Sequence, residues 1–160
     1  MRLGLISDTH GHEQLTRQAV RMLESLGVDA LLHCGDIGSP EIVEMLAAWR
    51  PYYVFGNCDI DRQPLRDAIA RWGGVCCEEF ADLTLAGERV ALLHSHDRQK
   101  FRQVIQSDSY ALVCYGHTHT AAIDRHGETL VVNPGAIYRA NPHSIGLVEL
   151  PGLDAQIISL

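Results

Sequence analysis

Short hydrophobic runs alternate with amphipathic stretches through the first half of the chain. Residues 2–6 form a strand-like run, and apolar residues then recur at helical spacing as far as Gly27. The next run, residues 30–33, is followed by Ser39-Pro40-Glu41, which combines a capping side chain, a first-turn proline and an acidic residue. This combination is typical of a helix N-terminus. The pattern therefore predicts βα units, with the second helix continuing until Pro51.

The pattern changes after about residue 72. Residues 52–55 read as a third strand, and a helix is expected from about Pro64 to Trp72, before Gly73-Gly74. Strand-like runs then dominate, interrupted by one amphipathic stretch at about residues 98–106; the expected strands are 83–85, 90–93, 112–115, 130–132 and 144–150. Turn-forming residues at 86–88 and 126–128 predict hairpins, so antiparallel pairs should accompany parallel ones.

Composition fits one globular domain spanning residues 1–160, since 46% of the residues are hydrophobic and 21% are charged. The net charge is −7 and Lys100 is the single lysine, so there is no basic stripe and we expect no bulk nucleic-acid binding. Asp8 interrupts the N-terminal apolar run, and no run is long enough to span a membrane. We therefore expect a cytoplasmic protein with no membrane partner. Its five cysteines, an odd number without a CxxC, predict no disulfide framework, and nothing indicates an oligomeric state.

Five of the predicted strands are each followed by polar side chains able to bind a metal. In chain order these residues are Asp8 and His10, Asp36, Asn57, His94, and His117 and His119. Ligand sites of α/β sheets form at the carboxyl ends of strands, so we expect the five loops to converge on one rim. Two carboxylates, one amide and four imidazoles suit manganese, iron, zinc, cobalt or nickel, and contain too much imidazole for calcium or magnesium.

Seven such residues exceed what one ion needs. They match two metal ions about 3.5 to 4 Å apart, bridged by a carboxylate, which is a geometry used for displacement at phosphorus. Asp36 is the candidate for the bridge. Glycines directly precede Asp36, Asn57 and His117. At the end of a strand the chain must turn sharply, and the ligand side chain must approach the ion without a Cβ of the preceding residue in the way. Glycine meets both needs because it has no Cβ and adopts a wider range of backbone conformations.

The residues that follow the five strands form five motifs, which are Asp8-Thr9-His10, Gly35-Asp36, Gly56-Asn57-Cys58-Asp59, His94 and Gly116-His117-Thr118-His119. In this order along the chain, they resemble the motifs of the calcineurin-like metallophosphoesterase superfamily. The short chain, the Gly-Asn-Cys-Asp form of the third motif and Asn133-Pro134-Gly135 are most similar to the small YfcE-type phosphodiesterases, whose fold the retromer subunit Vps29 shares. The resemblance implies an α/β fold, a four-layer α/β/β/α sandwich of two mixed sheets flanked by helices.

The resemblance also implies a division of the ligands and an activity. Asp8, His10 and His119 would hold one metal, while Asn57, His94 and His117 would hold the other, with Asp36 between them. The expected metals are two divalent transition ions, manganese first, with iron, zinc, nickel or cobalt as alternatives. The expected reaction is hydrolysis of a small phosphodiester substrate, in which hydroxide held between the ions attacks phosphorus in line and Asn57 also contacts the substrate.

The motifs leave more than one candidate donor for the leaving-group proton. Larger members of the superfamily often carry a histidine directly after the motif asparagine, where this chain has Cys58. A thiol with an ordinary pKa of about 8.5 is a poor proton donor. His96 is the expected stand-in, and a surface-loop role is its alternative. His12 and Arg139 are further candidates for substrate contact, although His12 can also begin the first helix and Arg139 can be a solvated loop charge. Asp59 either orients another group or caps a turn.

Four other kinds of protein are alternatives to an enzyme of this kind. A non-catalytic scaffold of the Vps29 type is the principal alternative, but every expected metal position carries a competent ligand. A dinucleotide-binding domain and a P-loop are excluded because their glycine signatures are missing. A metallo-β-lactamase-like site needs His-x-His-x-Asp-His, which neither histidine pair supplies.

Overall fold

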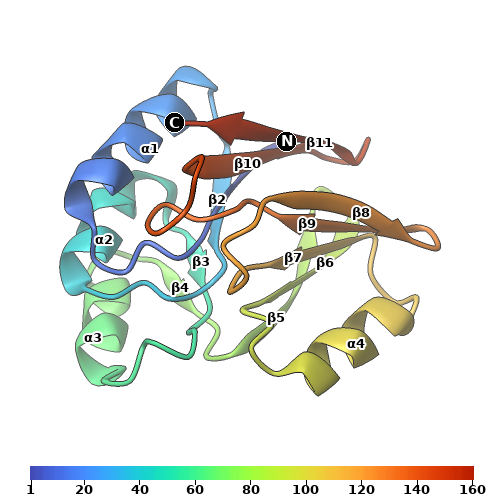
Figure 1. The fold of residues 1–160 in the computed structure, drawn as a ribbon, viewed down its shortest axis with the longest axis horizontal. Helices are drawn as coiled ribbons and strands as arrows, with labels where there is room; N and C mark the ends of the chain where they lie inside the picture. The colour runs from blue at the N-terminus through green and yellow to red at the C-terminus, as the bar shows by residue number, and fades with distance from the viewer.

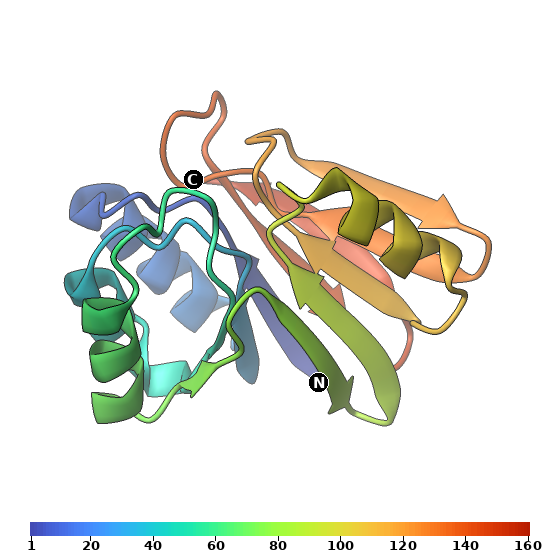
Figure 2. The ribbon, with the colours of Figure 1, turned by 90° about the horizontal axis from the view of Figure 1, so that it is seen from below.

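Two mixed β-sheets lie face to face between two layers of helices, as the computed structural model of residues 1–160 shows (Figure 2). The first sheet has six strands in the order β11 (Asp154–Ser159), β10 (Ser144–Glu149), β1 (Arg2–Ile6), β2 (Ala30–His33), β3 (Tyr52–Tyr53) and β4 (Val75–Cys76). Strands β1 to β4 are parallel, and β10 runs antiparallel to both β1 and β11. The predicted four-layer sandwich is confirmed.

The second sheet has five strands in the order β5 (Phe80–Leu85), β6 (Glu88–Leu93), β7 (Leu112–Tyr115), β9 (Thr129–Asn133) and β8 (Ala122–His126). Strands β6, β7 and β9 are parallel, while β5 and β8 pair antiparallel at the two edges through the predicted hairpin turns. The helices α1 (Glu13–Ser25), α2 (Pro40–Met45) and α3 (Gln63–Arg71) cover the first sheet, and α4 (Arg98–Gln106) covers the second (Figure 1). None of these helices has the length and apolar character needed to cross a membrane.

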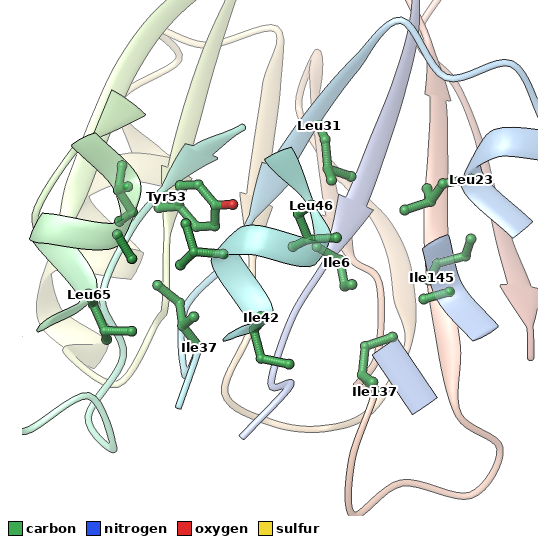
Figure 3. Packing of buried hydrophobic residues seen from close by; sticks show 14 of the residues in the cluster. Ile6, Leu23, Leu31, Ile37, Ile42, Leu46, Tyr53, Leu65, Ile137 and Ile145 are labelled. Carbon is green, nitrogen blue, oxygen red and sulfur yellow. The ribbon is translucent and has the colours of Figure 1, made fainter. Parts of the chain in front are cut away.

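The core has three layers because the central strands are buried on both faces. In β2, Leu31 packs with the helices while its neighbour Leu32 packs against the second sheet, as the twofold alternation of a strand requires. Figure 3 shows residues of the helix-facing layer, in which Leu23 of α1 and Ile42 of α2 belong to the same buried cluster as Ile6 of β1. The third layer buries Val104 of α4 against the second sheet.

The sequence-based predictions were wrong mainly at the ends and edges of elements. The second helix stops at Met45 and a short 3-10 helix, Ala47–Trp49, continues the chain until Arg50 adopts a left-handed conformation before Pro51. The third strand ends at Tyr53 rather than at residue 55. Three strands were missed, β4, β8 and β11, and all three are edge strands whose exposed faces weaken the hydrophobic signal.

Candidate metal centre

The carboxyl ends of strands from both sheets meet at one rim. Asp8 follows β1 and Asp36 follows β2 in the first sheet, whereas His94 follows β6 and His119 lies in the loop after β7 in the second. The Asp8 Oδ1 atom lies 3.1 Å from His119 Nε2 and 3.9 Å from His94 Nε2. The sheets therefore bring together side chains that are up to 111 positions apart in the sequence, from Asp8 to His119.

The two carboxyl oxygens of Asp8 differ, because one accepts hydrogen bonds and the other has no hydrogen-bond partner. Its Oδ2 accepts hydrogen bonds from Ser7 Oγ at 2.5 Å and from the backbone N–H of His117 at 3.1 Å. Its Oδ1 is buried and has no hydrogen-bond partner. The ligand atoms of Asp8, His10 and His119 all lie within 4.8 Å of one another. A buried carboxyl oxygen without a partner is unfavourable unless another group, such as a cation, compensates it.

The two histidines that face Asp8 Oδ1 are oriented by backbone carbonyls. His94 Nδ1 lies 2.8 Å from the carbonyl oxygen of Cys34, and His119 Nδ1 lies 3.2 Å from that of Arg139. A carbonyl only accepts, so each Nδ1 carries a proton and donates it, which leaves Nε2 as the ring atom that faces the carboxylate and can serve as a metal ligand. Acceptors that face one another across 3 to 4 Å leave space for a positive ion between them.

Asp36 lies between the two groups of imidazoles. Its Oδ2 is 3.7 Å from His10 Nε2 and 3.3 Å from His94 Nε2, and its Oδ1 accepts a 2.8 Å hydrogen bond from the backbone N–H of Cys58. Burial raises the pKa of Asp36, but the His94 imidazole and the Cys58 N–H outweigh this effect and bring the pKa below its ordinary value. Burial conversely lowers the pKa of His94, and Asp36 and Asp8 raise it above its ordinary value. Positive charge is thus favoured at this point, and the carboxylate and imidazole donors fit divalent transition metals.

The backbone is strained where the candidate ligands leave their strands. Twelve residues other than glycine have φ in the left-handed region, and five of them are candidate ligands: Asp8, His10, Asp36, His117 and His119. Such conformations are disfavoured for residues with a Cβ and persist where the surrounding structure imposes them, often at functional sites. The strain concentrates on the proposed ligand loops.

Buried polar side chains hold these loops together. The Asp59 carboxylate, 3% exposed, accepts hydrogen bonds from the backbone N–H groups of Ile37 (3.2 Å), Gly38 (3.0 Å) and Gly56 (2.9 Å). It joins the loop of Asp36 to that of Asn57, which identifies it as a turn cap with a wider role than the sequence indicates.

His33 and Thr9 supply a second connection. Burial, followed by the repulsion of His94, lowers the pKa of His33 to about 3, so its ring stays neutral. Its Nδ1 accepts from the Gly35 N–H at 3.2 Å, and its Nε2 donates to Thr9 Oγ1 at 2.9 Å. The Thr9 hydroxyl in turn donates to the Ile37 carbonyl at 2.9 Å. His33 is therefore a buried group with both ring nitrogens hydrogen-bonded, and it supports the loops of Thr9 and Gly35.

Three predicted site residues lie at the exposed side of the rim. Asn57 is exposed, and its Nδ2 lies 3.5 Å from Cys58 Sγ. His117 is exposed too; its ring centroid is 5.1 Å from that of His94, and it belongs to none of the groups of ligand atoms within 4.8 Å. Cys58 lies within that distance of His10 and Asp36. Partial burial, together with Asp36, raises the pKa of the Cys58 thiol to about 11, so it holds its proton at neutral pH.

The remaining predicted contacts have mixed surroundings. His96 is half-buried, 5.6 Å from His94 and 6.3 Å from His117 between ring centroids, and its Nδ1 has no partner. His12 caps α1, since its Nδ1 accepts from the Leu15 N–H at 3.3 Å, and its ring stacks on Tyr138. Arg139 contributes its carbonyl to His119, and its guanidinium lies 5.4 Å from the Tyr138 ring centre. No sequence signal indicated this backbone contribution.

Comparison with known proteins agrees with this geometry. The calcineurin-like phosphoesterase superfamily domain matches residues 1–151. The chain belongs to this superfamily. Phosphodiesterase MJ0936 of Methanocaldococcus jannaschii is 26% identical to this protein over 154 residues, which cover 93% of each chain. The probable metallophosphoesterase YsnB of Bacillus subtilis is 28% identical over 145 residues, covering 86% of this chain and 75% of YsnB.

Solved structures of similar fold extend the comparison. An archaeal phosphodiesterase superimposes over the full length of both chains with a TM-score of 0.92 and 25% identity. The phosphoesterase YfcE of E. coli has a TM-score of 0.68 at 20% identity and covers 99% of both chains. Vps29 of Cryptosporidium parvum has a TM-score of 0.68 at 17% identity and covers 99% of this chain and 96% of its own. The last two show a shared fold.

Proposed function

We propose that the protein is a metal-dependent phosphodiesterase that hydrolyses small phosphodiesters at a centre of two metal ions. The observation that carries the proposal is the buried Oδ1 of Asp8, which has no hydrogen-bond partner and faces the Nε2 atoms of His94 and His119. Membership of a phosphoesterase superfamily, and the phosphodiesterases among its relatives, support hydrolysis at phosphorus as the chemistry of this cluster.

The residues divide between the two ions as the superfamily resemblance implies. Asp8, His10 and His119 would hold one ion, and Asn57, His94 and His117 the other, with Asp36 shared between them. The close approach of Asp36 Oδ2 to both His10 and His94 supports the shared position. When bound, the two ions would supply an activated solvent nucleophile and neutralise charge on the phosphoryl oxygens. Manganese is the proposed metal, with iron, zinc, nickel or cobalt as alternatives.

The chain's own side chains have three further tasks. Asp36 stays ionised because its pKa is lowered, so it remains a negative partner for cations. His96 donates the proton to the leaving oxygen, since its half-buried ring lies beside His117 at the rim, 6.3 Å away between ring centroids. Cys58 keeps its proton and is the weaker donor. Asn57, at the exposed side of the rim, contacts the substrate together with His12 and Arg139.

The test is hydrolysis of bis-p-nitrophenyl phosphate by chelator-stripped protein before and after manganese is added. Asp36→Asn is the test variant, and Asp61→Asn is its matched control because Asp61 is exposed and forms no ion pair. We expect activity that returns with metal in the wild type and the control and stays absent in Asp36→Asn. Metal-loaded wild-type protein without activity under any of the five metals would contradict the proposal and favour a scaffold.

A further inference from the structure

A groove of about 460 Å³ lies next to the candidate metal centre, between helix α4 and the end of β7 with the loop that follows it. His117 lines its inner end, Arg98 and Arg102 of α4 line one side, and Phe101 and Tyr115 line its floor. A larger cavity of about 740 Å³ lies at the hairpin end of the second sheet, around Gly87 and Gly127, and contains none of the candidate ligands. The smaller groove adjoins the candidate metal centre, and it is far larger than the pocket of about 60 Å³ beside His94 and His96, so a substrate bound at the metals would extend into it.

The arginines of the groove are available to an anion. Arg98 and Arg102 are exposed, lie one helical turn apart, and neither forms an ion pair with a carboxylate. The Arg102 Nε donates to the Arg98 carbonyl at 3.3 Å, which holds the two residues on the same side of the helix. In a chain of net charge −7, this pair is a local exception, and guanidinium groups bind phosphate through a planar fork of donors.

The floor of the groove is aromatic. The rings of Phe101 and Tyr115 lie 4.6 Å apart between centroids with an interplanar angle of 42°, and both residues are half-buried. Their remaining exposed surface offers an apolar, polarisable platform between the metal centre and the arginines. A ligand that uses the whole groove needs an organic group between two anionic ones.

We propose that the substrate is a phosphodiester whose organic group carries a second phosphate. The scissile phosphate lies at the metal centre beside His117, the nucleoside-sized organic group lies on Phe101 and Tyr115, and the second phosphate binds Arg98 and Arg102. This inference rests on the proposed function, because it takes the metal centre as the place of hydrolysis.

Isothermal titration calorimetry tests the groove without turnover. Manganese-loaded protein is titrated with adenosine 3′,5′-bisphosphate, with adenosine 5′-monophosphate and with inorganic pyrophosphate. We expect the bisphosphate to bind about tenfold more tightly than the monophosphate, since hydrogen bonds between charged groups contribute at this level. Pyrophosphate should bind more weakly than the bisphosphate because it lacks the organic group.

The Arg98→Ala, Arg102→Ala double variant should lose the preference for the bisphosphate and keep the wild-type melting temperature. Its matched control is Arg21→Ala with Arg71→Ala, which removes two exposed, unpaired charges from α1 and α3 and should keep the preference.

Equal affinity of the wild type for both nucleotides, or an unchanged preference in the Arg98 and Arg102 variant, would overturn the second-phosphate site. Pyrophosphate binding as tight as that of the bisphosphate would overturn the aromatic platform. Hydrolysis of bis-p-nitrophenyl phosphate is scored separately, so failure of the groove and failure of the enzyme are distinguishable.

Discussion

Single side chains decide whether the ligand loops keep their strained conformations. Asp59 illustrates this because its carboxylate accepts three backbone N–H groups from two different loops while almost wholly buried. Ionised acceptors form stronger hydrogen bonds than neutral ones, and buried donors left without a partner are unfavourable. The position of Asp36 relative to Asn57 therefore depends on a residue that touches neither metal nor substrate.

Replacing Asp59 with alanine should lower the free energy of unfolding by about 3 kcal/mol, because three buried donors lose their acceptor. Manganese affinity should fall by about 10- to 100-fold, as it does when groups supporting metal ligands are removed. Urea denaturation and manganese titration measure the two effects. Asp61→Ala, two positions away and exposed, serves as the control and should change neither. Wild-type metal affinity in Asp59→Ala would show that the loops hold themselves in place.

His96 should matter in proportion to how much the leaving group needs a proton. His96→Gln is expected to lower kcat for an alkyl diester such as a dinucleotide by about 100-fold, the lower range for general acid catalysis. Hydrolysis of bis-p-nitrophenyl phosphate should change far less, because p-nitrophenolate leaves without protonation. Cys58→Ser should leave both rates near the wild type, since the thiol keeps its proton. An equal loss on both substrates would assign His96 to binding or folding instead.

Elements place the ligands through the turns at their carboxyl ends, and glycine makes two of these turns possible. At Gly35, with φ of +100°, an added Cβ would lie 2.6 Å from His94 Nδ1. At Gly56 it would collide with Asp36 Oδ1 and the Asp36 backbone. These glycines are needed because each lies against another candidate ligand: Gly35 against His94 of the second sheet, and Gly56 against Asp36 in the neighbouring loop of the first sheet.

Gly56→Ala should therefore displace Asp36 and abolish metal-dependent hydrolysis, with a loss of stability of about 2 kcal/mol from overpacking. Gly152→Ala is the matched control because its Cβ would meet the nearest atom at an ordinary 3.4 Å. Activity assays and thermal unfolding check both variants. A fully active Gly56→Ala enzyme would mean that Asp36 has room to move without consequence.

The central elements could be predicted from the sequence, whereas the edges could not. Strands β1, β2, β6 and β7 are buried on both faces, so nearly every position is apolar and the run is visible. In β8 four of five residues are exposed, and β4 has only two residues. The candidate ligands could be identified from the sequence because they follow the central strands. Two other contributions depend on loop geometry, which hydrophobic periodicity does not encode. One is the set of backbone hydrogen bonds to the Asp59 carboxylate, and the other is the contact of the Arg139 carbonyl with His119.

At the scale of the whole molecule, the candidate metal centre lies at the junction of the two sheets. Asp8, His10, Asp36 and Asn57 come from the first sheet, whereas His94, His117 and His119 come from the second. The complete ligand set therefore forms only when the sheets are packed. Binding of metal to the folded state alone couples metal affinity to stability.

Manganese at about 100 times its dissociation constant should therefore raise the free energy of unfolding by about 2.7 kcal/mol per independent site. Chelation should reverse the effect, and Asp36→Asn should reduce it. Thermal unfolding followed by circular dichroism, with and without manganese, provides the measurement. A melting temperature that is the same with and without metal in protein shown to bind it would contradict a site formed jointly by the two sheets.

The central claim is a pair of metal ions held by seven side chains at this junction. Anomalous diffraction from crystals grown with manganese tests it most directly. The expected result is two anomalous peaks per chain about 3.5 to 4 Å apart with Asp36 between them, one beside Asp8, His10 and His119 and the other beside Asn57, His94 and His117. A single peak, or peaks away from these residues, would contradict the binuclear centre.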